Sequence, residues 1–113
     1  MYEMAKGFLG GLELLVLLAV IQLGDESYGV PIAETIEESC GRRVALSSVY
    51  VALGSLSRKG LVTSRRGEPT AERGGRAKIH FQATPAGLRE ARRSHRALTT
   101  LWEGVAAFQG ARA

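Results

Sequence analysis

The order of apolar and polar positions predicts three helices, then two short strands, then a last helix. The first helix covers residues 9–23, which are apolar at almost every position. From residue 12 onward only Glu13 and Gln22 are polar in this stretch. A helix that is apolar on all sides is normally buried on all sides. The pattern therefore predicts a central helix in the core of a globular domain.

The same apolar run is too short for a membrane span and lacks the flanking residues of an export signal. As a helix, residues 8–23 rise only about 24 Å, whereas the hydrocarbon core of a bilayer is about 30 Å thick. An export signal begins with a basic segment and ends at small residues. Here Glu3 precedes the run, and Asp25 and Glu26 follow it. We therefore expect no membrane partner and a cytoplasmic protein.

The second helix is predicted to begin after Tyr28-Gly29, because Pro31 suits the first turn of a helix. Its apolar positions fall at helical spacing: Ile32, Ala33, Ile36 and Cys40. Because Cys40 is the only cysteine, an internal disulfide and a disulfide-stapled secreted scaffold are excluded. Cys40 is interpreted as a small core residue. The nearby Arg42 and Arg43 leave a redox switch as the alternative.

The third helix runs to Lys59, and either Ser47 or Ser48 can cap its start. One face carries the core stripe Val49, Ala52, Leu53 and Leu56. The opposite face carries Ser48, Val51, Ser55 and Arg58. This second set is predicted to point away from the core.

After Gly60 the period changes from helical to alternating, which predicts strands over residues 61–66 and 78–83. A loop rich in turn-forming residues joins them. Thr84 and Pro85 then supply the cap and the first turn of the last helix. The order α-α-α-β-β-α is that of a winged helix-turn-helix fold, mainly α with a small β-hairpin. We expect this domain over residues 1–84 and a C-terminal dimerisation helix over residues 85–113.

Charge is divided unevenly along the chain. Its 113 residues carry 15 Lys and Arg against 11 Asp and Glu, a net charge of +4. Residues 1–41 hold one cation and seven acids, a balance of −6, and residues 42–113 hold the remainder, a balance of +10. A basic segment favours a polyanionic partner. We expect the third helix and the hairpin to bind it.

Double-stranded DNA suits this arrangement, because the second helix of a helix-turn-helix pair enters the major groove. Hydroxyls and amides at its start can bind phosphates. Val51 can touch a thymine methyl, and Ser55 can bond to a base edge. The candidate contacts are Ser47, Ser48, Val51, Ser55, Arg58, Lys59, Arg65, Arg66, Arg73, Arg76 and Lys78. The alternatives are a merely solvated hairpin, or a protein-interaction module that docks an acidic protein without binding DNA.

The last helix predicts a homodimer. Leu88, Ala91, His95, Leu98, Trp102 and Val105 are spaced 3, 4, 3, 4 and 3 residues apart, which is the spacing of a coiled-coil-like contact. Together with Leu12, Leu15 and Val16 of the first helix, we call these residues the dimer seam. Packing of this helix onto the first helix of the same chain is the alternative. The arginines Arg89, Arg92, Arg93 and Arg96 are assigned to solvent or intra-dimer ion pairs rather than to DNA.

Five segments together resemble the short form of the PadR family of winged-helix transcription regulators. They are residues 12–17, Tyr28-Gly29, residues 49–62, residues 73–78 and residues 84–88. The resemblance covers residues 9–105. It implies a homodimer that binds a roughly palindromic operator, most often as a repressor. It also implies that Tyr50 and the residues around it face the DNA backbone, and that Gly74 and Gly75 belong to the DNA-binding wing. Because Tyr50 lies at the edge of the core stripe, its partial burial is the alternative.

The chain departs from the family pattern at Gly54-Ser55, where relatives often carry a charged or polar residue. Because the third helix carries little charge, we expect the hairpin, or wing, to make more of the DNA contacts. Relatives can bind aromatic effectors between subunits, and Trp102 could stack on such a ligand. Plain packing of Trp102 is the simpler interpretation, and we predict no particular effector. With two distant histidines and one cysteine, the sequence shows no zinc pattern. We expect no cofactor, no metal and no enzyme activity.

Overall fold

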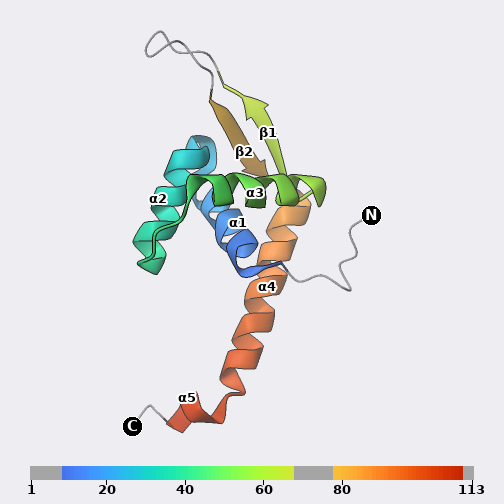
Figure 1. Ribbon diagram of the computed structural model, residues 1–113. Coiled ribbons are helices and arrows are strands. Elements are labelled where there is room, and N and C mark those ends of the chain that lie inside the picture. The colour runs from blue at the N-terminus through green and yellow to red at the C-terminus, as the bar shows by residue number, and fades with distance from the viewer. Residues whose placement is uncertain (1–8, 68–77, 111–113) are drawn as a thin grey trace.

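The computed structural model describes residues 9–67 and 78–110 and has the predicted winged helix-turn-helix architecture (Figure 1). Its helices and strands, in chain order, are α1 (Gly11–Leu23), the 3-10 turn η1 (Gly24–Glu26), α2 (Gly29–Cys40), α3 (Leu46–Arg58), β1 (Val62–Arg66), β2 (Ile79–Ala83), α4 (Pro85–Glu103) and α5 (Ala106–Gly110). The fold class is therefore confirmed. The short helix α5 was not predicted, and it divides the expected last helix in two.

Helix α1 lies at the centre, with α2, α3, α4 and β2 packed around it. The side chains of Val16, Leu17 and Val20 are almost completely buried. They meet the predicted core stripe of α3 and the inner face of α2: Val49, Ala52, Leu53, Leu56, Ile32, Ala33 and Ile36. One face of α1 stays open in the single chain: Leu15, a member of the predicted dimer seam, and Leu18 are 37% and 43% exposed.

Two local predictions about α2 and α3 are corrected. Cys40 is exposed, because it is the last residue of α2, one turn beyond the buried Ile36, and the chain turns away at Gly41 in a left-handed conformation (φ 70°). Helix α3 begins one residue before the serines, so its N-cap is Ala45 and neither serine caps it. The first turn of α3 consequently has no side-chain cap.

The hairpin is antiparallel, with Val62 opposite Ala83 and Arg66 opposite Ile79. Phe81 turns towards the core and is 9% exposed. Its amide donates a 2.8 Å hydrogen bond to the carbonyl of Ser27, so β2 is also fastened to the turn before α2. The hairpin therefore has a fixed base beside α1 and α2.

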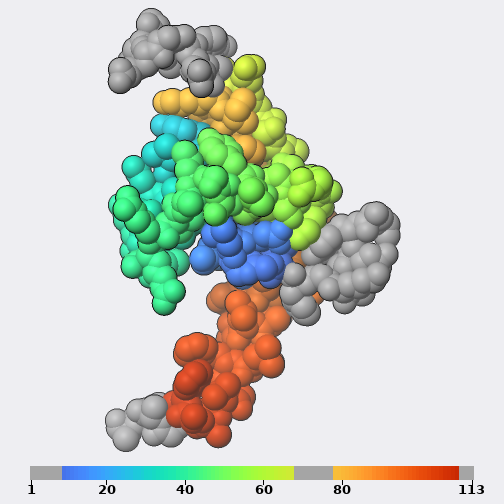
Figure 2. Space-filling model, viewed as in Figure 1, coloured from blue at the N-terminus to red at the C-terminus, as the bar shows by residue number. Residues whose placement is uncertain are grey.

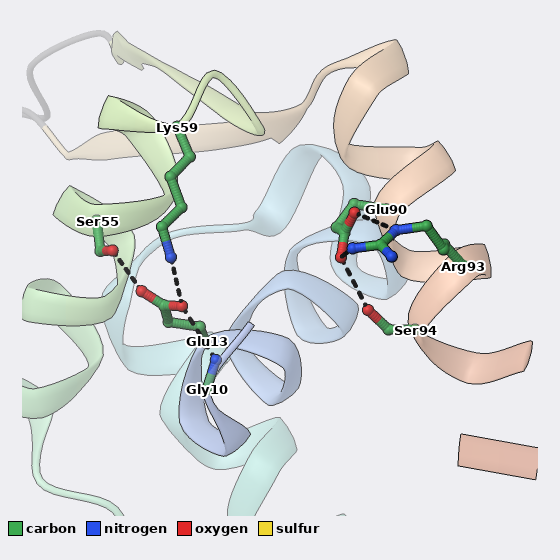
Figure 3. A network of polar contacts seen from close by, with 7 residues as sticks. All are labelled: Gly10, Glu13, Ser55, Lys59, Glu90, Arg93 and Ser94. Carbon is green, nitrogen blue, oxygen red and sulfur yellow. Dashed lines mark hydrogen bonds and ion pairs between the residues drawn. The ribbon is translucent and has the colours of Figure 1, made fainter. Parts of the chain in front are cut away.

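The start of α4 belongs to the core, and its far half projects away from the body of the molecule (Figures 1 and 2). Thr84 is the predicted cap: its hydroxyl accepts a 3.0 Å hydrogen bond from the amide of Gly87. Glu90 is 3% exposed, and its carboxylate accepts hydrogen bonds from Arg93 at 3.0 and 3.1 Å and from the Ser94 hydroxyl at 3.1 Å (Figure 3). These bonds satisfy a carboxylate that burial would otherwise destabilise. No helix within residues 9–67 and 78–110 combines the length and apolar character that crossing a membrane requires.

Candidate nucleic-acid interface

The side of α3 opposite the core forms what we call the outward face: Ser47, Tyr50, Val51, Gly54 and Arg58. Val51 is 71% exposed and Tyr50 is 46% exposed, so Tyr50 is partly buried and still reaches the surface. A Cβ atom at Gly54 would meet only the Arg58 guanidinium, at 3.5 Å. The Arg58 side chain therefore lies back along this face. Ser48 is only partly exposed and borders it.

Tyr50 is held in place by the start of α2. A Cβ atom at Gly29 would lie 2.6 Å from Cζ of Tyr50 and 3.1 Å from its Cε2 atom, distances that no side chain tolerates without displacing the ring. The glycine of the Tyr28-Gly29 pair thus makes room for Tyr50. The sequence alone marked these residues as a family motif but did not reveal this contact.

Tyr28 connects the start of α2 to the hairpin. The Lys78 ammonium lies 4.5 Å from the centre of the Tyr28 ring and donates a 3.3 Å hydrogen bond to its hydroxyl. The ring of His80 packs edge-on against the Tyr28 ring, with the two ring centres 5.3 Å apart. Contacts through Tyr50, Gly29, Tyr28 and Lys78 therefore lead from the outward face of α3 to the loop end of the hairpin.

Ser55 and Lys59 do not point outward, which corrects the prediction for their polar groups (Figure 3). The Ser55 hydroxyl donates a hydrogen bond to Oε2 of Glu13 on α1. The Lys59 ammonium lies 2.8 Å from Oε1 of the same carboxylate, which also accepts a 3.2 Å hydrogen bond from the amide of Gly10. We call these four residues the Glu13 network. The sequence suggested Glu13 only as a polar exception in an apolar helix.

The Glu13 network determines the charge state of its carboxylate. Burial by itself raises the pKa of Glu13, but the hydrogen bonds from Lys59, Ser55 and Gly10 and the charge of Lys59 outweigh it and lower the pKa below its usual value. Glu13 is therefore ionised at neutral pH and forms a partly buried ion pair with Lys59, whose side chain is 21% exposed.

The third helix and the hairpin together form a basic surface. Residues 46–67 and 78–83 contain five cations and no acid. Four of these cations are exposed: Arg58, Arg65, Arg66 and Lys78. The predicted wing residues Arg73, Gly74, Gly75 and Arg76 lie outside the described residues. Within the described part of the chain, no three His, Cys, Asp or Glu residues come together as a metal site requires.

The dimer seam divides into buried and exposed members. Val16 and Ala91 are 0% and 6% exposed and belong to the core of their own chain, so their assignment to an interface between subunits is corrected. Val105 lies between α4 and α5 rather than on the predicted continuous helix. Leu12 is partly buried against the core. The remaining members are exposed: Leu15, Leu88, His95, Leu98 and Trp102.

Comparisons with known proteins were made on the sequence and on the fold. Residues 17–93 match the family described as "Transcriptional regulator PadR-like family". No curated protein matches the chain. Among the solved structures that are similar in fold are three transcription regulators, each below 25% identity. A transcriptional regulator from Clostridium thermocellum has 19% identity over 96% of both chains, with a TM-score of 0.71.

The second is a PadR family transcription regulator from Clostridium difficile, with 17% identity over 88% of this chain and 99% of its own, and a TM-score of 0.71. The third is a PadR-like transcription factor from Bacteroides fragilis, with 20% identity over 86% of this chain and 88% of its own, and a TM-score of 0.72. The family match spans more than half of the chain and coincides with the winged helix-turn-helix described above. The chain therefore belongs to the PadR-like family of DNA-binding transcriptional regulators.

Proposed function

We propose that the protein is a homodimeric repressor that binds a roughly palindromic operator through the outward face of α3 and the hairpin. The observation that carries this proposal is the segregation of charge in space. The surface formed by α3, β1 and β2 has five cations and no acid among the described residues. A surface of this composition attracts any polyanion, an acidic protein included, so the shape of α3 must provide the preference for DNA.

The residues of the outward face suit a helix lying in the major groove. Val51 is the most exposed of its large apolar residues and can contact a thymine methyl group. The uncapped first turn of α3, around Ser47, presents amide groups at the positive end of the helix, where a phosphate is stabilised. Tyr50, held against Gly29, is placed at the edge of this contact.

The exposed cations of the hairpin suit contacts with the DNA backbone. Arg65, Arg66 and Lys78 lie at the end of the hairpin nearest the wing loop. We assign to the same loop the predicted contacts of Arg73 and Arg76. Ser55 and Lys59 are left out of the proposed contacts because the Glu13 network holds their polar groups against α1.

The exposed part of the dimer seam supports association of two copies. A groove of about 590 Å³ between α1 and α4 is lined partly by Leu18, Leu88 and His95. Beyond it, Leu98 and Trp102 are 57% and 64% exposed on the projecting half of α4. Apolar side chains that are exposed together in this way favour a protein partner. A second copy covers both at once and gives the two-fold symmetry that a palindromic operator requires. The repressor role rests on the resemblance to the family, and no effector is proposed.

The test is a salt titration of DNA binding, using promoter fragments from the gene's own neighbourhood and a scrambled duplex as control. Four exposed cations per protomer amount to eight in a dimer. If each neutralises one phosphate, affinity falls by about 10⁴-fold between about 50 and 200 mM salt. Operator binding also requires tighter binding to one promoter fragment than to the scrambled duplex. Weak, salt-independent binding to every duplex would refute the proposal and favour docking to an acidic protein.

A further inference from the structure

Glu13 lies where α1 passes beneath the C-terminal end of α3 (Figure 3). Its side chain is 18% exposed, and the paired side chain of Lys59 is 21% exposed. The carboxylate holds two residues of α3 at once, because one oxygen bonds to Ser55 and the other to Lys59. The Gly10 amide donates a further hydrogen bond to the oxygen that Lys59 contacts. These contacts join residues that are 42 and 46 positions apart in the sequence.

The partner of Glu13 is a cation at the end of the proposed DNA-binding helix. Lys59 directly follows Arg58, whose side chain is exposed on the outward face. A flexible lysine at this position would ordinarily add a phosphate contact of its own. Instead, its charge is matched by a carboxylate whose pKa is lowered. The two adjacent cations therefore differ: Arg58 is exposed, whereas Lys59 is paired with Glu13 of α1.

We propose that Glu13 is a positioning residue that withholds Lys59 from DNA and thereby limits sequence-independent binding. This inference rests on the proposed function, because it concerns how that DNA surface is regulated by α1. Phosphate contacts raise affinity for every sequence alike, whereas base contacts distinguish sequences. Removing one cation per protomer from the phosphate-binding set therefore lowers affinity for competing DNA. It leaves the base contacts of the outward face unchanged.

The experiment measures affinity for a short mixed-sequence duplex without an operator, over a range of salt concentrations. Glu13→Gln keeps an oxygen that accepts from Ser55 but removes the charge that holds Lys59. One released phosphate-binding cation per protomer steepens the slope of log affinity against log salt by about 0.9 for each protomer in contact with DNA. Between about 50 and 200 mM salt, this adds a factor of about 3.5 per protomer to the loss of affinity.

A matched control separates release of Lys59 from a general change in net charge. Glu103→Gln changes the net charge by the same amount at an exposed position at the far end of α4, and we expect it to leave the slope at the wild-type value. The double variant Glu13→Gln with Lys59→Met should return to the wild-type slope. A purely structural role for Glu13 would lower affinity or melting temperature without steepening the slope.

Two results would overturn the inference while leaving the proposed function intact. One is a slope for Glu13→Gln no steeper than that of Glu103→Gln. The other is a slope for the single variant Lys59→Met that is shallower than wild type by about 0.9 per protomer, since Lys59 would then already contact phosphate. Lys59→Met keeps the test decisive even if Glu13→Gln does not fold. Absence of salt-dependent DNA binding in the wild-type protein would instead refute the proposed function itself.

Discussion

The junction between α3, β1 and α4 depends on a glycine that only the folded structure explains. A Cβ atom at Gly87 would lie 3.1 Å from the carbonyl carbon of Leu61 and closer than 3.0 Å to its oxygen. Both atoms belong to the backbone, so no side chain can rotate away. The same carbonyl oxygen accepts a 3.0 Å hydrogen bond from the amide of Thr84. Gly87→Ala therefore forces α4 away from the start of the hairpin.

The expected cost of Gly87→Ala combines two effects. Forcing an extra methyl group into a close-packed site costs about 1–3 kcal/mol, and weakening the backbone hydrogen bond adds about 1 kcal/mol. We expect the free energy of unfolding to fall by about 2–4 kcal/mol and the melting temperature by roughly 10 °C.

Gly54→Ala is the matched comparison, since it makes the same change in another helix. At Gly54 the added methyl group meets only the flexible end of Arg58, at 3.5 Å. The gain in helix propensity should therefore raise the free energy of unfolding by about 1 kcal/mol. Urea denaturation followed by circular dichroism, at one fixed protein concentration, measures both variants. A Gly87→Ala protein at least as stable as wild type would refute the close approach of α4 to Leu61.

Two further predictions concern the Glu13 network and the dimer seam. The pKa of Glu13 is lowered from its ordinary value of 4.5 in the folded protein, so its stabilising contribution is present above that value and is lost as pH falls through the folded pKa. Glu13→Gln should therefore reduce the loss of unfolding free energy at acid pH, measured by urea titrations at several pH values. An unchanged loss at acid pH would contradict the assignment. Leu98→Asp should weaken the dimer by about 100-fold or more, because it places an unpaired charge in the proposed contact. Analytical ultracentrifugation measures this, with Val51→Asp on the outward face as the control that should remain dimeric, and equal sedimentation of the two variants would count against the seam.

Local signals in the sequence predicted most of the secondary structure. The change of period after Gly60 located the hairpin, and Thr84-Pro85 located the start of α4 together with its cap. These predictions succeeded because helix caps and alternating strands depend on residues close together in the chain. The predicted serine cap of α3 was wrong, because the helix begins at Leu46, before both serines, and its N-cap Ala45 has no side chain that can accept a hydrogen bond.

The separation of DNA-contact candidates from structural residues required the tertiary structure. Ser55 and Arg58 both lie away from the core stripe on a helical wheel, yet Ser55 bonds to Glu13 and Arg58 remains exposed. Similarly, Leu98 and Ala91 share one heptad-like spacing, but Ala91 is buried against its own chain. A helical wheel gives direction around one axis and contains no information about which other helices lie there.

The sequence by itself determined the order of helices and strands, the winged helix-turn-helix class and the concentration of cations after residue 41, because periodicity and composition act over short distances. The tertiary structure alone decided that Gly29 gives room to Tyr50, that Gly87 lets α4 approach Leu61, and that Glu13 takes Lys59 out of the exposed basic surface. Each of these three depends on atoms that are more than 20 residues apart in the chain, and their meeting follows from how the helices pack around α1.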